Sequence, residues 1–338
     1  MKLSGHFAQS LITQTQKHPR SIVFPEGDDP RVIDAVSSLI DQKCTKQVKL
    51  LGDSNKIREL LSSSSGKLLE DHRVQVLETS ELIPKAESCY QSYLNSKNRS
   101  AEKAAIDSWA KHPANQAASL LFHGEVEAAI GGCVYSTATI IKATIQGVGL
   151  EKNPGTISGS FAMVKELDGS AAHKSYVFAD CGVVIEPTAE QLVTIAEDSV
   201  KTFQQLFPDE EPKVAFLSFS TKGSAQHAAA DKMIEAAEAF KKANPKIIAD
   251  GELQFDAAFV PEVARRKSPD SSLQGDANCF IFPDLNSGNI AYKITQRLAG
   301  FDAYGPILQG GAKPYSDLSR GATSKDIFMA SLITMLRC

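Results

Sequence analysis

Three ordered segments late in the chain decide the fold: FPDLNSGNIAYK (282–293), GPILQGGAKP (305–314) and DLSRG (317–321). They predict a strand and a helix, then a second strand, then a polar loop that opens the last helix, Ala322 to Leu336. Ser319 and Arg320 precede that helix, where free backbone N–H groups and the positive end of the helix dipole favour an anion. The Arg320 guanidinium adds a planar fork of donors that suits phosphate. Taken alone, the dipeptide is better explained by a loop-ending serine and an arginine in a surface ion pair.

Upstream of these segments, short runs rich in β-branched and aromatic residues alternate with segments of helical period. The strand candidates are SIVFP (21–25), QVKLL (47–51), VQVLE (74–78), EAAIGG (127–132), SYVFAD (175–180), KVAFLSF (213–219), KIIADG (246–251) and CFIFP (279–283). Helical period runs through Pro30–Asp41, Ala189–Leu206 and Ala225–Ala243. This alternation predicts an α/β fold with parallel-type sheets flanked by helices.

The length of 338 residues predicts two domains, since one core rarely serves so long a chain. The turn-rich stretch GVGLEKNPGTISG (147–159) is the best candidate boundary. Hydrophobic residues make up 42% and charged residues 22%, which is typical of a globular protein. A formal net charge of -4 argues against a general nucleic-acid surface, which needs a basic stripe.

Several other classes are excluded by missing motifs. The first twenty residues have helical spacing and lack the apolar run of a signal peptide, and no window reaches the roughly 18 apolar residues of a membrane span. The six cysteines are scattered, without a CxxC pair or zinc spacing, which predicts reduced thiols in a cytoplasmic protein. The sequence has no GxGxxG, P-loop, GxSxG or HExxH motif. It therefore gives no support for a dinucleotide-binding protein, a P-loop nucleotide-binding protein, a serine hydrolase or a zinc metalloprotease.

The order and wording of the segments closely resemble the phosphotransacetylase (phosphate acetyltransferase) and phosphate butyryltransferase family. The resemblance covers nearly the whole chain. Besides the C-terminal segments, it rests on IVFPEGDDPRVIDA (22–35), GGCVYSTATIIKATIQ (131–146), VFADCGVVIEPTAEQL (177–192), VAFLSFSTKGSAQH (214–227) and DGELQFDAA (250–258). It implies reversible acetyl transfer, in which acetyl-CoA and phosphate give acetyl phosphate and CoA. Coenzyme A is then a substrate, and neither a metal nor a permanently bound cofactor is implied.

The resemblance also implies an architecture like that of isocitrate and isopropylmalate dehydrogenases. Domain I is then discontinuous, residues 1–153 plus 312–338, domain II is 154–311, and the site lies in a cleft between them. A homodimer through domain II is implied as well, with small-molecule partners only. Two alternatives stay open: a propionyl- or butyryltransferase, and a catalytically impaired paralogue that binds CoA or acyl phosphate.

Three residues match the family's catalytic positions. Ser319 and Arg320 are implied to bind the acyl phosphate and the transition-state charge, and Asp326 is implied to be the base that handles the CoA thiol proton. A thiol near pKa 8.5 is mostly protonated at neutral pH, so such a base would help. The structural alternative for Asp326 is a capping box with Thr323, and both roles are compatible.

In GGCVYSTATIIKATIQ (131–146), Ser136 and Thr137 open a predicted helix and could donate to an anion, although by spacing alone an ordinary N-capping serine is the better account. Lys142 in the same segment could supply a point charge for substrate. The segment departs from the usual GAVHTTADTIRPAL: Tyr135 replaces a histidine, Thr139 an aspartate and Lys142 an arginine. At a second position where the family usually has an arginine, this chain has Asn95, in YLNSKNRS (93–100). The cations Lys97 and Arg99 follow within that segment, and by default they are solvated surface charges.

Four more substrate-binding candidates lie in domain II. Ser158 and Ser160 in ISGSFAMV (157–164) match a family segment beside the phosphate region, although alternation with apolar residues equally fits a plain strand. Asn286 and Ser287 in NSGN are predicted at a strand-to-helix turn, where they would offer donors.

Overall fold

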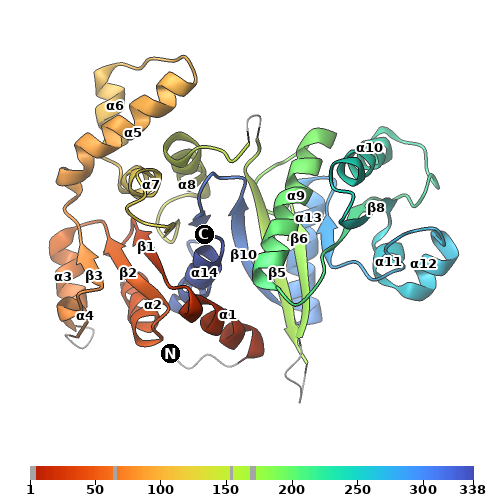
Figure 1. Cartoon of the computed structure of the whole chain (residues 1–338), viewed down its shortest axis with the longest axis horizontal. Coiled ribbons are helices and arrows are strands. Elements are labelled where there is room, and N and C mark those ends of the chain that lie inside the picture. Colours follow the sequence, from red (N-terminus) through yellow and green to blue (C-terminus); the bar gives the residue numbers. More distant parts are fainter. Residues whose placement is uncertain (1–4, 64–66, 153–154, 168–172) are drawn as a thin grey trace. The chain divides into compact units, whose positions relative to one another are not determined.

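The computed structural model describes residues 5–63, 67–152, 155–167 and 173–338. The chain divides into two compact units, residues 1–151 with 311–338 and residues 152–310. Figure 1 shows both units, with most of their helices and several of their strands labelled. In each, helices cover a sheet, so the predicted α/β class is confirmed. None of the described helices combines the length and the apolar character needed to cross a membrane.

The first unit is built on a five-stranded parallel sheet of order β11-β4-β1-β2-β3. The strands are β1 Arg20–Phe24, β2 Thr45–Leu50, β3 Val74–Val76, β4 Ala128–Gly131 and β11 Tyr315–Asp317. The chain therefore returns after the second unit to add β11 beside β4, with Tyr315 opposite Ala129. The strand β11 has only three residues, and the sequence analysis did not predict it.

Helices surround this sheet, and two of them, α2 and α14, help to position the candidate site. The helices and helical turns are α1 His6–Lys17, α2 Pro30–Asp41, α3 Ser54–Ser63, α4 Lys67–Glu70, η1 Thr79–Leu82, α5 Ile83–Ser96, α6 Lys103–Ala110, α7 Pro113–Phe122, α8 Thr137–Ala143, η2 Thr144–Val148 and α14 Ser324–Leu336. Helix α2 begins at Pro30 because the Asp29 side chain accepts a hydrogen bond from Arg31 N. Helix α14 packs against α1, α2, β1 and β4, and its buried residues surround the helix. Such burial fixes where α14 starts, and so fixes the loop before it.

The second unit holds a six-stranded sheet of order β10-β5-β6-β9-β7-β8. Its elements are β5 Ser158–Glu166, β6 His173–Ala179, α9 Ala189–Leu206, β7 Lys213–Leu217, α10 Ala228–Ala243, β8 Ile248–Leu253, α11 Phe255–Phe259, α12 Pro261–Lys267, β9 Cys279–Ile281, α13 Leu285–Ala299 and β10 Asp302–Gln309. The β10–β5 and β5–β6 pairs are antiparallel, so the sheet is mixed and the expectation of a parallel-type sheet is only partly right. Aromatic side chains including Phe161, Phe178 and Phe280 form its core. Each contributes about 1.5–3 kcal/mol by burial.

Candidate functional site

The strand order of the first sheet marks one place as a site. From β1 the chain runs outward through β2 and β3, and then returns to add β4 on the other side of β1. In open parallel sheets, ligands bind beyond the carboxyl ends of the strands at such a reversal. Three loops leave the sheet there: residues 25–29 after β1, 132–136 after β4, and 318–323 after β11.

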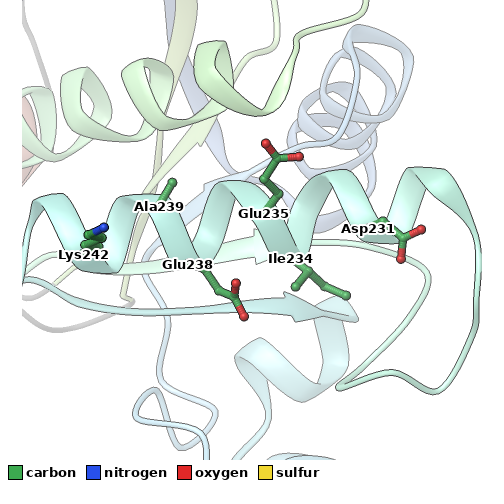
Figure 2. Close-up of a pocket in the computed structure, with 6 residues that line it drawn as sticks. All are labelled: Asp231, Ile234, Glu235, Glu238, Ala239 and Lys242. Atoms are coloured by element: carbon green, nitrogen blue, oxygen red, sulfur yellow. The ribbon is translucent and has the colours of Figure 1, made fainter.

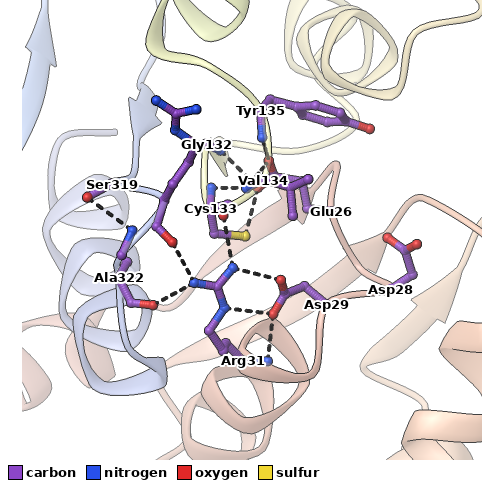
Figure 3. Close-up of polar contacts among 12 residues, drawn as sticks. Glu26, Asp28, Asp29, Arg31, Gly132, Cys133, Val134, Tyr135, Ser319 and Ala322 are labelled. Carbon is purple, nitrogen blue, oxygen red and sulfur yellow. Dashed lines mark hydrogen bonds and ion pairs between the residues drawn. The ribbon is translucent and has the colours of Figure 1, made fainter.

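The loop after β4 is already occupied by a carboxylate of the protein. Glu26, which is 2% exposed, accepts hydrogen bonds from the backbone N–H groups of Gly132, Cys133, Val134 and Tyr135 at 2.8, 3.0, 2.9 and 2.6 Å. These contacts are drawn in Figure 3. Successive N–H groups of this kind form an anion-binding nest. Since Glu26 fills it, these four donors are not available to a substrate.

Two residues of the loop after β4, Cys133 and Gly132, have structural roles. The Cys133 thiol donates to Glu26 Oε2 at 2.9 Å, and burial together with the carboxylate raises the pKa of that thiol. Cys133 is therefore a structural thiol and not a nucleophile. Gly132 has φ 108°, and a Cβ at this position would lie 2.4 Å from Asp317 Oδ1, so only glycine fits.

Ser319 and Arg320 lie where the sequence predicted them, in the exposed loop before α14. Ser319 Oγ accepts a hydrogen bond from Gly321 N at 3.2 Å. Among the residues that the structure describes, the Arg320 guanidinium has no hydrogen-bond or ion-pair partner. A charged fork of five donors beside a helix N-terminus can take a phosphate dianion.

Asp326 belongs to the capping box that the sequence predicted. Asp326 N donates to Thr323 Oγ1 at 3.2 Å, while Thr323 N and Thr323 Oγ1 donate to Asp326 Oδ2 at 2.9 and 2.8 Å. The hydrogen bonds that this carboxylate receives from the described residues all end on Oδ2. Its Oδ1 is thus left to accept a proton or a substrate bond, and the cap does not block a role as base. That role stays a prediction.

Ser136 and Thr137 are held by the protein itself. Ser136 is the N-cap of α8, as predicted, and its Oγ accepts from Thr139 N at 3.2 Å. Thr137 Oγ1 donates to Asp317 Oδ2 at 2.6 Å. Asp317 is 2% exposed, and burial raises its pKa from 3.8 to about 6. The sequence analysis missed Asp317, whose one signal was its place two residues before Ser319.

Asp317 gives the fold a measurable pH dependence. Because the pKa is raised in the folded state, the stabilising contribution is full below pH 3.8 and is lost as the pH rises through 6. As the pH rises from 4.5 to 7.5, ionisation of Asp317 should lower the free energy of unfolding of the unsubstituted protein by about 2 kcal/mol. Asp317→Asn should not show this loss. Urea unfolding at both pH values measures this difference. The control is Asp71→Asn, because hydrogen bonding to Arg73 lowers the pKa of Asp71 to about 2, below the tested range. A pH dependence unchanged in Asp317→Asn would contradict the assignment.

Lys142 lies in the last turn of α8 and lines a pocket of about 410 Å³. The other lining residues are Tyr90, Ala105, Ser108, Trp109, His112, Asn115 and Thr139. The rings of Tyr90 and Trp109 stack at 4.7 Å between centroids. The pocket therefore combines aromatic walls with one cation.

Asn95 in α5 and the cations Lys97 and Arg99 after it are all exposed, and their substrate roles stay predictions.

Among the four candidates of the second unit, Ser158 and Ser287 make hydrogen bonds within the protein. Ser158 and Ser160 are fully buried in β5, which confirms the plain-strand alternative, and Ser158 Oγ lies 3.2 Å from Gln309 Oε1, to which it donates. The expected strand-to-helix turn at Asn286 and Ser287 is wrong. Both residues lie in the first turn of α13, because the side chain of N-cap Asp284 accepts from Ser287 N and Oγ at 2.8 and 2.9 Å. Binding of substrate by these four residues stays a prediction.

A second hollow of about 410 Å³ runs along α10 in the second unit. Figure 2 shows that one helix supplies its lining: Asp231, Ile234, Glu235, Glu238, Ala239 and Lys242. Three carboxylates against one ammonium disfavour an anionic substrate there. Across the described ranges, no group of three or more His, Cys, Asp or Glu side chains is placed to hold a metal ion.

Comparisons with known proteins show the family to which this chain belongs. The family model described as phosphate acetyl/butaryl transferase matches residues 6–335. The chain is 38% identical to a phosphate acetyltransferase of Bacillus subtilis, with 93% of each chain covered, and 39% identical to one of Acetivibrio thermocellus, with 98% of each covered. A phosphotransacetylase structure from Streptococcus pyogenes superposes with a TM-score of 0.87 at 37% identity, covering 98% of this chain and 97% of the other. A putative 4-hydroxythreonine-4-phosphate dehydrogenase from Salmonella typhimurium shares the fold, with a TM-score of 0.53 at 10% identity, covering 95% of this chain and 99% of the other.

Proposed function

Because this chain belongs to the phosphate acetyl/butaryl transferase family over almost its whole length, we propose that it is a phosphate acetyltransferase. It transfers an acetyl group reversibly between coenzyme A and inorganic phosphate. The observation that carries the proposal is the loop before α14, where Arg320 is exposed and unpaired among the described residues and Asp326 keeps one oxygen without a bond from them. Both residues stand at the positions that the family resemblance implies.

The proposed reaction is direct transfer. A phosphate oxygen held by Arg320 and Ser319 attacks the acetyl carbonyl carbon, a C–O bond forms, and the C–S bond to CoA breaks. The leaving thiolate takes a proton from Asp326, and in the reverse direction the Asp326 carboxylate accepts the thiol proton. Arg320 stabilises the negative charge that develops during transfer.

We place part of the CoA molecule in the pocket beside Lys142. Its aromatic walls suit a heterocycle, and the ammonium of Lys142 supplies a point charge for a phosphate. The predicted contributions of Ser136, Thr137, Ser158, Ser160, Asn286 and Ser287 belong to the same proposal. Ser136 and Thr137 would have to exchange an internal hydrogen bond to bind substrate.

A second function, binding of CoA or acyl phosphate without turnover, is favoured by one observation. Asn95 is neutral where the family has an arginine, and its side-chain oxygen accepts a hydrogen bond from Gln91 at 2.9 Å. Together with Lys142 in place of an arginine, this leaves fewer strong phosphate ligands.

The test is phosphate-dependent release of CoA from acetyl-, propionyl- and butyryl-CoA, followed with a thiol reagent. Release that requires phosphate and is fastest with acetyl-CoA is the expected result. Faster release from a longer chain would make the protein a propionyl- or butyryltransferase. Binding of CoA without release from any donor, by protein shown to be folded, would favour the second function.

We further propose a homodimer formed through the second unit, in the cytoplasm. Helix α13 exposes Ile290, Ile294 and Leu298 at 56%, 52% and 84%, and this spacing puts them on one face. An exposed apolar stripe of this kind is typical of a protein interface. Reducing conditions suit both the CoA thiol and the six free cysteines. Light scattering is expected to give twice the chain mass of 36.4 kDa, and a monomer would contradict the dimer.

A further inference from the structure

Arg31, in the first turn of α2, uses all five of its guanidinium donors. Nη1 donates to Arg320 O at 2.9 Å and to Ala322 O at 3.0 Å, and Nη2 donates to Cys133 O at 2.9 Å. Nε and Nη2 also bind the two carboxylate oxygens of Asp29 at 3.0 and 2.8 Å. Figure 3 shows the guanidinium at the centre of these contacts. One side chain thereby joins the loops after β1, β4 and β11.

The two carbonyls held by Arg31 lie on either side of Gly321. In a trans peptide the C=O and the next N–H point in opposite directions. Holding Arg320 O therefore turns the Gly321 N–H away from Arg31, and that N–H donates to Ser319 Oγ. Holding Ala322 O likewise turns the Thr323 N–H away, and that N–H donates to Asp326 Oδ2. Arg31 thus sets the backbone that orients Ser319, Arg320 and Asp326.

The charge of Arg31 is permanent and is balanced locally. Its hydrogen bonds with Asp29 raise the pKa of Arg31 and lower that of Asp29. The pair therefore stays ionised through the neutral range. Its side chains are 33% and 13% exposed, so water screens it only in part. A lysine would keep the charge but has three donors without the planar fork, and could not reach five acceptors.

We propose that Arg31 is a positioning residue for acetyl transfer, which holds the segment from Ser319 to Asp326 in its active geometry without touching substrate. This inference rests on the proposed function. A displacement of about 1 Å in a catalytic group costs about 10²-fold in rate. We therefore expect Arg31→Lys to lower kcat/KM for phosphate about 10²-fold.

The chain offers a matched control in Arg73. Its Nε and Nη2 bind both oxygens of Asp71 at 2.9 and 2.7 Å, two residues earlier, as Arg31 binds Asp29. Its Nη1 donates to Ile40 O at 3.2 Å, outside the three site loops. Arg73→Lys should therefore lose a similar amount of stability and keep the activity of the unsubstituted protein.

The experiment compares the unsubstituted protein, Arg31→Lys and Arg73→Lys in three measurements: phosphate kinetics, urea unfolding, and amide hydrogen exchange of residues 319–327. We expect lost activity and faster exchange in this segment in Arg31→Lys alone. Equal kinetics and exchange in Arg31→Lys and the unsubstituted protein, or equal losses in both variants, would overturn the positioning role. If the unsubstituted protein releases no CoA, the proposed function fails. The exchange data then still decide whether Arg31 holds the segment.

Discussion

Replacement of Arg320 by lysine is expected to lower kcat/KM for phosphate by about 10²- to 10³-fold, the range seen when one charge-stabilising donor is lost. Lysine keeps the positive charge but cannot offer two parallel N–H groups to a phosphate. The folded state should be little affected, because the Arg320 side chain is exposed and bonds to none of the described residues. The loss should therefore appear in catalysis and phosphate affinity, and not in stability.

The measurement is initial-rate kinetics with phosphate varied at saturating acetyl-CoA, together with urea unfolding of each protein. A suitable control is Arg58→Lys, because Arg58 is an exposed arginine paired with Glu78 at 3.3 Å, outside the three site loops. If Arg320→Lys kept the phosphate KM and kcat of the unsubstituted protein, Arg320 would not be a phosphate ligand. A comparable loss in Arg58→Lys would point to a general effect of charge geometry.

Much of the fold could be predicted because each element carries its own local signal. Pro30–Asp41 and Ala189–Leu206 match α2 and α9, since each has a helical apolar period and an N-cap residue. The short strand β11 could not be predicted, because Tyr-Ser-Asp has no pattern and is a strand only through its pairing with β4. The antiparallel position of β5 depends on two partner strands, and such pairing is not written in one segment.

Some residues of the candidate site could likewise be predicted from a local motif, and others could not. Ser319, Arg320 and Asp326 lie in one short motif, and the capping box that Asp326 forms follows from its spacing to Thr323. Arg31 lies 289 residues away in sequence from Arg320, whose carbonyl it holds. Glu26 stands in a polar loop that reads as surface, although it is 2% exposed. These contacts between distant segments arise only when parallel strands bring their loops to one edge of the sheet.

The family predicted from the sequence is confirmed. The question for Asp326 is then whether its carboxylate acts as a base or only caps α14. A carboxylate in a capping box is ordinary helix chemistry, so a loss of activity on its replacement has two possible causes: loss of a base, and loss of the cap. Asparagine is the informative substitution. Its amide oxygen can still accept from Thr323 N, whereas it cannot take up a proton.

Asp326→Asn is therefore expected to keep most of its stability and to lose about 10²- to 10⁴-fold in rate, the usual contribution of general acid–base catalysis. The loss should depend on pH in the direction that forms acetyl-CoA. Without a base, the attacking species is the thiolate present in solution, and a thiol ionises near pH 8.5. The rate of the variant should then rise about tenfold per pH unit below that value, more steeply than the rate of the unsubstituted protein.

Initial rates from acetyl phosphate and CoA between pH 6 and 9, for both proteins, measure this difference. Asp53→Asn is the matched control, since Asp53 caps the start of α3 through bonds from Asn55 N and Lys56 N at 3.0 and 3.1 Å and lies outside the site loops. Asparagine caps a helix about as well as aspartate, so this substitution should change stability little and leave activity unchanged. Parallel pH–rate curves for Asp326→Asn and the unsubstituted protein would remove Asp326 as the base, because a missing base must make the reaction follow thiolate concentration.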